Sequence, residues 1–200
     1  MSSGEWLVLA RTKYMLDKLE PTLYESGYYY NNKFRKQKEH TLHLAALDWE
    51  NLCKGQLLSY DQVVRIYGYM HVDKTKLKSM LKDSMYDMDT LKKHHGLKTN
   101  AVWFEAFDAA PRREINYLKQ MRRRGEKLNQ APRITLSTIH GAKGGEAENV
   151  VLLTDLSFNT MKSYEKNPDD ENRLFYVGAT RTKEHLHIIR PQQDNKGYNL

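Results

Sequence analysis

Cysteine is almost absent from this sequence, which has 200 residues and a single cysteine, Cys53. One cysteine cannot form an internal disulfide, and the Cys and His residues nowhere show the spacing of a zinc site. Nothing in the chain therefore requires an oxidising compartment. We expect the protein in a reducing cytoplasm, held together by its apolar core.

Long apolar runs are also lacking. No segment approaches the ~20 apolar residues of a membrane-spanning helix, and residues 1–5 lack the charged-then-apolar pattern of a secretory signal. Internal repeats and low-complexity tracts are missing too. These absences exclude repeat architectures and predict a chain without a membrane partner.

Positive charge, by contrast, is in excess. Lys and Arg number 32 against 25 Asp and Glu, which gives a net charge of +7. This excess fits a polyanion as partner, and it fits equally a soluble protein with a basic surface. A hydrophobic content of 40% is enough for one core with a small subdomain.

Both ends of the chain show alternating strand and helix patterns. The apolar run at residues 6–10 predicts a strand covered on both faces, and Thr12 can cap a helix whose Leu16, Leu19 and Leu23 share one face. Towards the C-terminus, strands are predicted at 133–138, 149–154 and 185–189, with a helix at 169–179. This order predicts an α/β domain with a parallel sheet.

The middle of the chain, from about residue 40 to 125, changes to helical periods without convincing strands. Ser59 and Gln62 have the spacing of a capping box ahead of an apolar helical face. We therefore predict one α/β domain formed by residues 1–35 and 131–200, interrupted by a helical insertion at 36–130.

Two groups of side chains in the insertion have a functional and a structural interpretation. One is a group of arginines that could bind duplex DNA or simply complement a helix end, namely Arg112, Arg113, Arg122, Arg123 and Arg124. The other is aromatic: Trp49, Trp103 and Phe104 could stack on bases, although their helical spacing favours the core.

The most informative segment runs from Thr138 to Glu146 and reads Thr-Ile-His-Gly-Ala-Lys-Gly-Gly-Glu. It follows a predicted strand, at the edge where parallel sheets bind ligands. Its three glycines allow backbone amides to approach a ligand closely. It is not a Walker A phosphate loop, whose spacing occurs nowhere in the chain.

A second segment, from Glu171 to Arg181, predicts a helix that ends in an arginine just before the last strand. One interpretation of Arg181 is a cation that complements the helix dipole. The other is a planar, permanently charged group that binds a phosphate held by another domain.

Together these two segments resemble motifs V and VI of the UvrD/Rep family of superfamily 1 helicases, in the same order and with similar spacing. The segment Leu7-Val8-Leu9-Ala10-Arg11-Thr12, with the following helix and Gly27-Tyr28-Tyr29, is similar to motif IV of that family. The resemblance covers both α/β ends. It implies a RecA-like domain of the P-loop NTPase type, with the helical block in the place of the family's accessory insertion.

In that family, two RecA-like domains hold ATP between them. The resemblance implies that this chain is the second domain, and that a first domain supplies Walker A, the Mg²⁺-binding acids of Walker B and the catalytic glutamate. It assigns Arg11 and Arg181 as arginine fingers beside the γ-phosphate, where guanidinium groups stabilise the charge of the transition state. It assigns Glu146 to the ATP ribose.

The same resemblance places Thr138 and His140 on the phosphates of single-stranded DNA, facing away from the nucleotide, and makes Lys143 a further phosphate contact. Phosphate contacts hold a strand without reading its sequence. From the residues alone, His140 could equally be satisfied within the fold and Lys143 could pair with an acid. The family's polarity implies movement from 3′ to 5′.

Two functions remain open. The chain is either the C-terminal half of an ATP-dependent DNA helicase, active only with its first domain, or a non-catalytic nucleic-acid-binding module that keeps the fold. The joint presence of Arg11, Glu146 and Arg181 favours the motor, because a binding module has no need of groups directed at a nucleotide. The cellular pathway, repair or replication, stays open.

Overall fold

The computed structural model describes residues 3–35, 41–191 and 197–198. The chain divides into two compact units, one formed by residues 1–38 with 120–200 and the other by residues 39–119. The sequence patterns placed these boundaries at 35/36 and 130/131. Helix α6 (Arg112–Arg123) crosses the second boundary, so its last turn belongs to the first unit.

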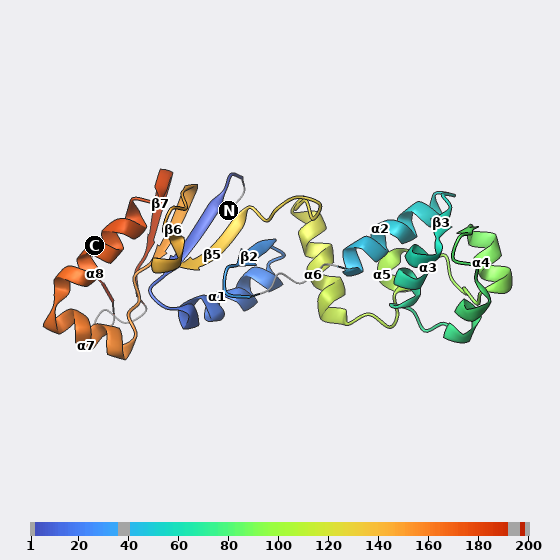
Figure 1. Cartoon of the computed structure of the whole chain (residues 1–200), viewed down its shortest axis with the longest axis horizontal. Helices are drawn as coiled ribbons and strands as arrows, with labels where there is room; N and C mark the ends of the chain where they lie inside the picture. The colour runs from blue at the N-terminus through green and yellow to red at the C-terminus, as the bar shows by residue number, and fades with distance from the viewer. Residues whose placement is uncertain (1–2, 36–40, 192–196, 199–200) are drawn as a thin grey trace. The chain divides into compact units, whose positions relative to one another are not determined.

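The first unit is built on a five-stranded sheet with the order β2-β5-β1-β6-β7, in which every pair of neighbouring strands is parallel (Figure 1). The strands are β1 (Trp6–Ala10), β2 (Tyr30–Asn32), β5 (Ile134–Thr138), β6 (Ala147–Leu153) and β7 (Thr182–Ile189). The parallel α/β fold class predicted from the sequence is therefore confirmed.

Helices cover both faces of this sheet. On one face, α1 (Lys13–Glu25) packs Met15, Leu16 and Leu23 against alternate residues of β1 and β5. On the other face, Phe175 of α8 (Pro168–Ala179) and Met161 of α7 (Phe158–Lys166) join the opposite alternate residues of β1 and β6. Burial on both faces explains the uninterrupted apolar runs of the central strands.

The strand at residues 6–10 has the predicted bounds, and α1 follows it. Thr12 occupies the N-cap position, but its side chain makes no capping hydrogen bond, contrary to the sequence-based prediction. Pro21 lies inside α1 without ending it. Gly27 follows the helix with φ +72°, and a Cβ there would lie 2.3 Å from Cβ of Gln120. Only glycine fits this turn.

Two elements of the first unit were missed by the sequence analysis. Strand β2 has only three residues, too few to show a period, and α7 lies in a polar segment without a clear apolar face. The edge strand β7 begins three residues earlier than predicted. Its side chains are largely exposed, and it is an edge strand that pairs only with β6 among the described strands.

The second unit is mainly helical, as predicted, with a small antiparallel pair of strands that the sequence patterns did not reveal. Trp49, Trp103 and Phe107 are buried in its core, which confirms the structural interpretation of the two tryptophans. The Gln62 side chain accepts a hydrogen bond from the Ser59 amide at 2.9 Å, as expected for a capping box. The elements are α2 (Thr41–Cys53), β3 (Leu58–Ser59), α3 (Tyr60–Tyr67), η1 (Lys74–Ser79), β4 (Met85–Tyr86), α4 (Met88–His94), α5 (Trp103–Ala106) and most of α6.

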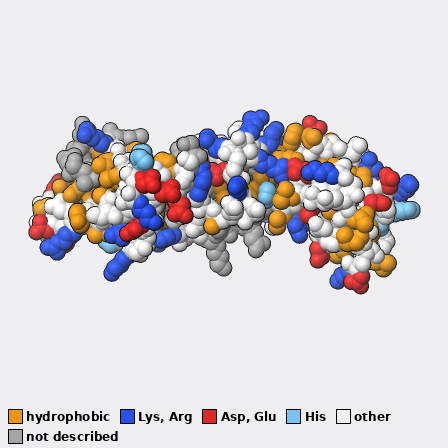
Figure 2. All heavy atoms as spheres, turned by 90° about the horizontal axis from the view of Figure 1, so that it is seen from above, with side chains coloured by type: hydrophobic (Ala, Val, Ile, Leu, Met, Phe, Trp, Pro, Cys, Tyr) orange, Lys and Arg blue, Asp and Glu red, His pale blue; other side chains and the backbone are white. Residues whose placement is uncertain are grey.

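Acidic and basic side chains are interspersed on the face seen in Figure 2. The excess of positive charge is therefore not gathered into one patch on this face. None of the helices in the described part of the chain has the length and apolar character needed to cross a membrane.

Candidate functional site

Two loops of the sequence-predicted site begin at the same edge of the sheet. Arg11 follows the last residue of β1, and Ile139 and His140 follow the last residue of β5. Because β1 and β5 are adjacent and parallel, with Ala10 opposite Thr138, these residues lie side by side. The carboxyl edge of a parallel sheet is where such folds form ligand sites.

Arg11 at this edge is held by Glu171 of α8. Its Nε donates to the Glu171 carboxylate at 2.8 Å and its Nη2 at 2.8 Å, so the pair is bidentate. Glu171 is 4% exposed, while the Arg11 side chain keeps 23% of its surface. The carboxylate also lies in the first turn of α8, where the helix dipole favours negative charge.

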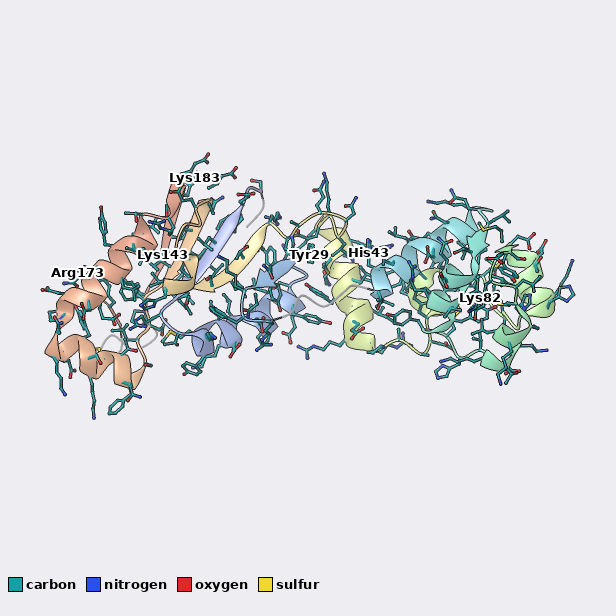
Figure 3. All side chains as sticks on the ribbon, viewed as in Figure 1. Tyr29, His43, Lys82, Lys143, Arg173 and Lys183 are labelled. Carbon is teal, nitrogen blue, oxygen red and sulfur yellow. The ribbon has the colours of Figure 1, made fainter. Side chains whose placement is uncertain are left out.

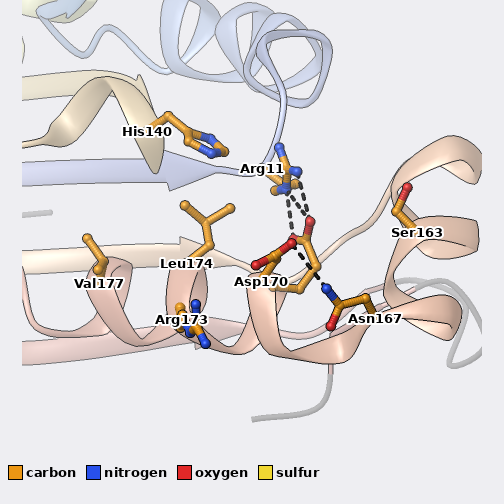
Figure 4. Close-up of a pocket in the computed structure, with 9 residues that line it drawn as sticks. Arg11, His140, Ser163, Asn167, Asp170, Arg173, Leu174 and Val177 are labelled. Carbon is orange, nitrogen blue, oxygen red and sulfur yellow. Dashed lines mark hydrogen bonds and ion pairs between the residues drawn. The ribbon is translucent and has the colours of Figure 1, made fainter.

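A pocket of about 610 Å³ opens beside this ion pair (Figure 4). Two arginines and a histidine line it, Arg11, Arg173 and His140, together with the acids Asp170 and Glu171. Arg11 is engaged by Glu171, so the exposed Arg173 and His140 are the groups available to an anion. The remaining lining comes from α7, α8 and the residue between them, namely Ser163, Asn167, Leu174 and Val177.

The loop after β5 is tightly constrained at its start. Thr138 Oγ1 accepts a hydrogen bond from the Gly141 amide at 3.1 Å, and Lys33 Nζ donates to the Gly141 carbonyl at 3.3 Å. A Cβ on Gly141 would lie 2.8 Å from the hydroxyl of Ser137, so the glycine is required by close packing. Beyond this turn Lys143, labelled in Figure 3, is exposed, and its side chain forms no hydrogen bond with the described residues.

The end of the same loop lies at the opposite edge of the sheet. Glu146 immediately precedes β6 and Arg181 immediately precedes β7, and the Ala147 amide donates to the Arg181 carbonyl at 3.1 Å. Arg181 Nε donates to the Val177 carbonyl at 3.0 Å, so the guanidinium caps its own helix. Its Nη1 group bonds none of the described residues, and Glu146 is exposed.

The structure does not bring Arg11 and Arg181 together. Leu9 pairs with Leu152, so Arg11 is level with position 154, whereas Arg181 is level with position 146. Eight residues along a strand correspond to roughly 26 Å, more than two extended arginine side chains can bridge. The prediction that both arginines meet beside one phosphate is therefore wrong for this domain, because the two residues follow opposite ends of parallel strands.

Five of the six predicted residues instead form two groups. Glu146 and Arg181 share the amino edge of the sheet, while Arg11, Thr138 and His140 share the carboxyl edge, and Lys143 lies in the loop between them. The roles of these residues toward nucleotide and DNA stay predictions. No group of three or more His, Cys, Asp or Glu side chains that could hold a metal ion occurs in the described ranges.

A family model described as the UvrD-like helicase C-terminal domain matches residues 14–193. The chain belongs to this family. The match includes residues 138–146 and 171–181, the segments that resemble motifs V and VI, and it begins after Arg11. No curated protein matches the sequence. UvrD-like helicase C-terminal domains are typically part of ATP-dependent helicases, which use ATP and Mg²⁺ and pair this domain with an N-terminal RecA-like domain on DNA.

Sequence reasoning missed Glu171 as the partner of Arg11. Glu171 lies in the first turn of a helix that starts with Pro168, and this position by itself indicates only a favourable interaction of the carboxylate with the helix dipole. Sequence reasoning also missed Phe34 and Lys33, which lie against the loop after β5. A turn that follows a three-residue strand leaves no periodic signal by which to find them.

Proposed function

We propose that this UvrD-like domain acts as the second half of an ATP-dependent DNA helicase motor. A first RecA-like domain, carrying Walker A and Walker B, would hold ATP and Mg²⁺. The present chain would complete the nucleotide site in trans and contact single-stranded DNA. The observation that carries the proposal is the meeting of Glu146 and Arg181 at one sheet edge, within the two segments that match the family.

In this proposal Arg181 is the arginine finger. Two donors of its guanidinium are engaged by Val177 and Thr180 of its own helix end, and Nη1 remains for an oxygen of the γ-phosphate. The helix-end contacts hold the planar group in one orientation, which lowers the entropy lost when it binds a phosphate. Glu146, exposed at the same edge, would accept a hydrogen bond from the ribose.

Arg11 has no part in the nucleotide site of this proposal. Its fork is occupied by the buried carboxylate of Glu171, and releasing it would leave that charge without a partner. We assign Arg11 to holding the end of β1 against α8.

The carboxyl edge is proposed as the DNA-binding side, with Thr138, His140 and Lys143 near the phosphates. The exposed side chains at and beside the pocket support this, since His140 and Arg173 line it and Lys143 follows His140 by three residues. Such contacts release counterions, so binding should weaken steeply with salt.

The test is strand-stimulated ATP hydrolysis by the chain combined with a first RecA-like domain. Arg181→Ala should lower the maximal rate by about 10³-fold or more, because an arginine finger contributes that order of acceleration. Tyr176→Ala, on the same helix, 69% exposed and outside the pocket lining, is the matched control and should retain most of the ATPase rate. An unchanged rate in Arg181→Ala would exclude the finger assignment.

The alternative function is a nucleic-acid-binding module without a motor. Absence of hydrolysis in any combination, together with single-strand binding that ATP leaves unchanged, would favour that alternative.

A further inference from the structure

The turn after β2 presents an exposed aromatic side chain, Phe34, in a rigid frame. The Phe34 amide donates to Asn32 Oδ1 at 3.0 Å, and Asn32 Nδ2 donates to Glu20 Oε1 of α1 at 2.9 Å. Asn32 and Glu20 are 7% and 8% exposed, so the bond between them is buried, and the bond from the Phe34 amide is partly buried. The backbone of Phe34 is therefore fixed relative to α1, while its ring reaches the surface.

The Phe34 ring lies against the loop after β5. Its Cζ atom is 3.4 Å from the position that a Cβ on Gly141 would take. Lys13 Nζ lies 4.3 Å from the ring centroid, and Lys33, the preceding residue, bonds the Gly141 carbonyl. The Phe34 ring and the Lys33 ammonium group thus lie against the loop that contains His140 and Lys143, and the Lys13 ammonium group lies over the ring.

This combination has the chemistry of a single-strand binding surface. Proteins that hold single strands without sequence preference combine cations for the backbone with aromatic rings on which bases stack. Phe34 is 36% exposed, so part of its surface is open to a base. Its backbone is already ordered, so a stacking base would not have to order the turn.

We propose that Phe34 stacks on a base of single-stranded DNA, with Lys13 and Lys33 beside the adjacent phosphates. The inference rests on the proposed function, because it places the strand at the carboxyl edge of the sheet. It adds to that function a contact with a base, which none of Thr138, His140 and Lys143 supplies.

A matched control lies on the other face of the sheet. Phe158 of α7 is 72% exposed and has Lys162 Nζ 4.5 Å from its ring centroid, so it repeats the pairing of Phe34 with a lysine. It belongs to a helix that packs on the opposite face from α1. Phe158→Ala therefore removes a similar exposed ring on the face of the sheet opposite to α1.

The experiment measures binding of the chain to a fluorescent oligothymidine and to an abasic strand of the same length. Phe34→Ala should weaken binding to oligothymidine by roughly five- to a hundred-fold, the range expected for one stacked base. It should leave binding to the abasic strand unchanged, because that strand has no base to stack. Phe34→Trp should keep the wild-type affinity and show quenching of its indole fluorescence by oligothymidine.

Three further variants separate stacking on the Phe34 ring from other effects on binding. Phe34→Leu keeps apolar volume without a ring, and it should bind oligothymidine as weakly as Phe34→Ala. Lys143→Ala should weaken binding to both strands, since each retains its phosphates. Phe158→Ala should behave as wild type on both.

The outcomes distinguish a failure of the stacking inference from a failure of the proposed function. Wild-type affinity of Phe34→Ala for oligothymidine would overturn the stacking inference alone, and so would an equal loss on both strands. If the wild-type chain bound neither strand, the DNA-binding part of the proposed function would fail as well.

Discussion

Arg11 and Glu171, separated by 160 residues, form a bidentate ion pair that ties the end of β1 to the first turn of α8. Arg11→Ala should lower the free energy of unfolding by about 3–5 kcal/mol, because it leaves a buried carboxylate without its partner. Urea denaturation measures this. Arg173→Ala, on the exposed side of α8, should change it by no more than about 0.5 kcal/mol.

The comparison of Arg11→Ala with Arg11→Lys tests the geometry of the pair. Lysine restores the charge but not the two-donor fork, so it should recover only part of the lost stability. Equal stability of the lysine variant and the wild type would show that charge alone matters. A cost for Arg11→Ala as small as that for Arg173→Ala would contradict the structural assignment of Arg11.

Two glycines have nearly the same backbone conformation but different surroundings, so their alanine variants separate the cost of backbone strain from the cost of a steric clash. Gly27 has φ +72° and Gly125 has φ +73°, but a Cβ meets the backbone of residue 120 only at Gly27, at 2.7 Å. Gly125→Ala should cost about 1–2 kcal/mol for the left-handed conformation. Gly27→Ala should cost a further ~1–3 kcal/mol for overpacking. Equal thermal or urea midpoints for the two variants would contradict this packing.

Asp87, the N-cap of α4, should contribute to the acid sensitivity of the second unit. The hydrogen bond from the Thr90 amide, at 2.7 Å, holds the pKa of the Asp87 carboxyl below its ordinary value of 3.8. A carboxyl with a depressed folded-state pKa stabilises the fold above the unfolded pKa, and this stability is lost as pH falls through the folded value.

Asp87→Asn should therefore show a shallower fall in urea midpoint than the wild type below about pH 4, since asparagine still caps but does not titrate. Asp87→Ala, which removes the cap as well as the charge, is the comparison and should lower the urea midpoint at neutral pH. Parallel acid profiles for Asp87→Asn and the wild type would exclude this contribution.

Much of the architecture could be predicted from local patterns. The strands β1 and β6 were found because parallel strands covered on both faces need continuous apolar residues, as Val8 and Val151 illustrate, while β5 alternates Ile134 and Leu136 with polar residues. The family resemblance was likewise contained in short contiguous segments around His140 and Arg181, and the family match includes both. Short strands such as β2 were missed because three residues carry no measurable period.

The sequence by itself determined the parallel α/β class, the family and the side chains available for chemistry. Only the tertiary structure decided which of those side chains share a site. The loop after β5 starts at the carboxyl edge with Thr138 and returns to the amino edge at Glu146, so neighbours in sequence reach opposite edges. Arg11 and Arg181 separate for the same reason, since strand pairing, which is a long-range property, sets the edge at which each loop lies.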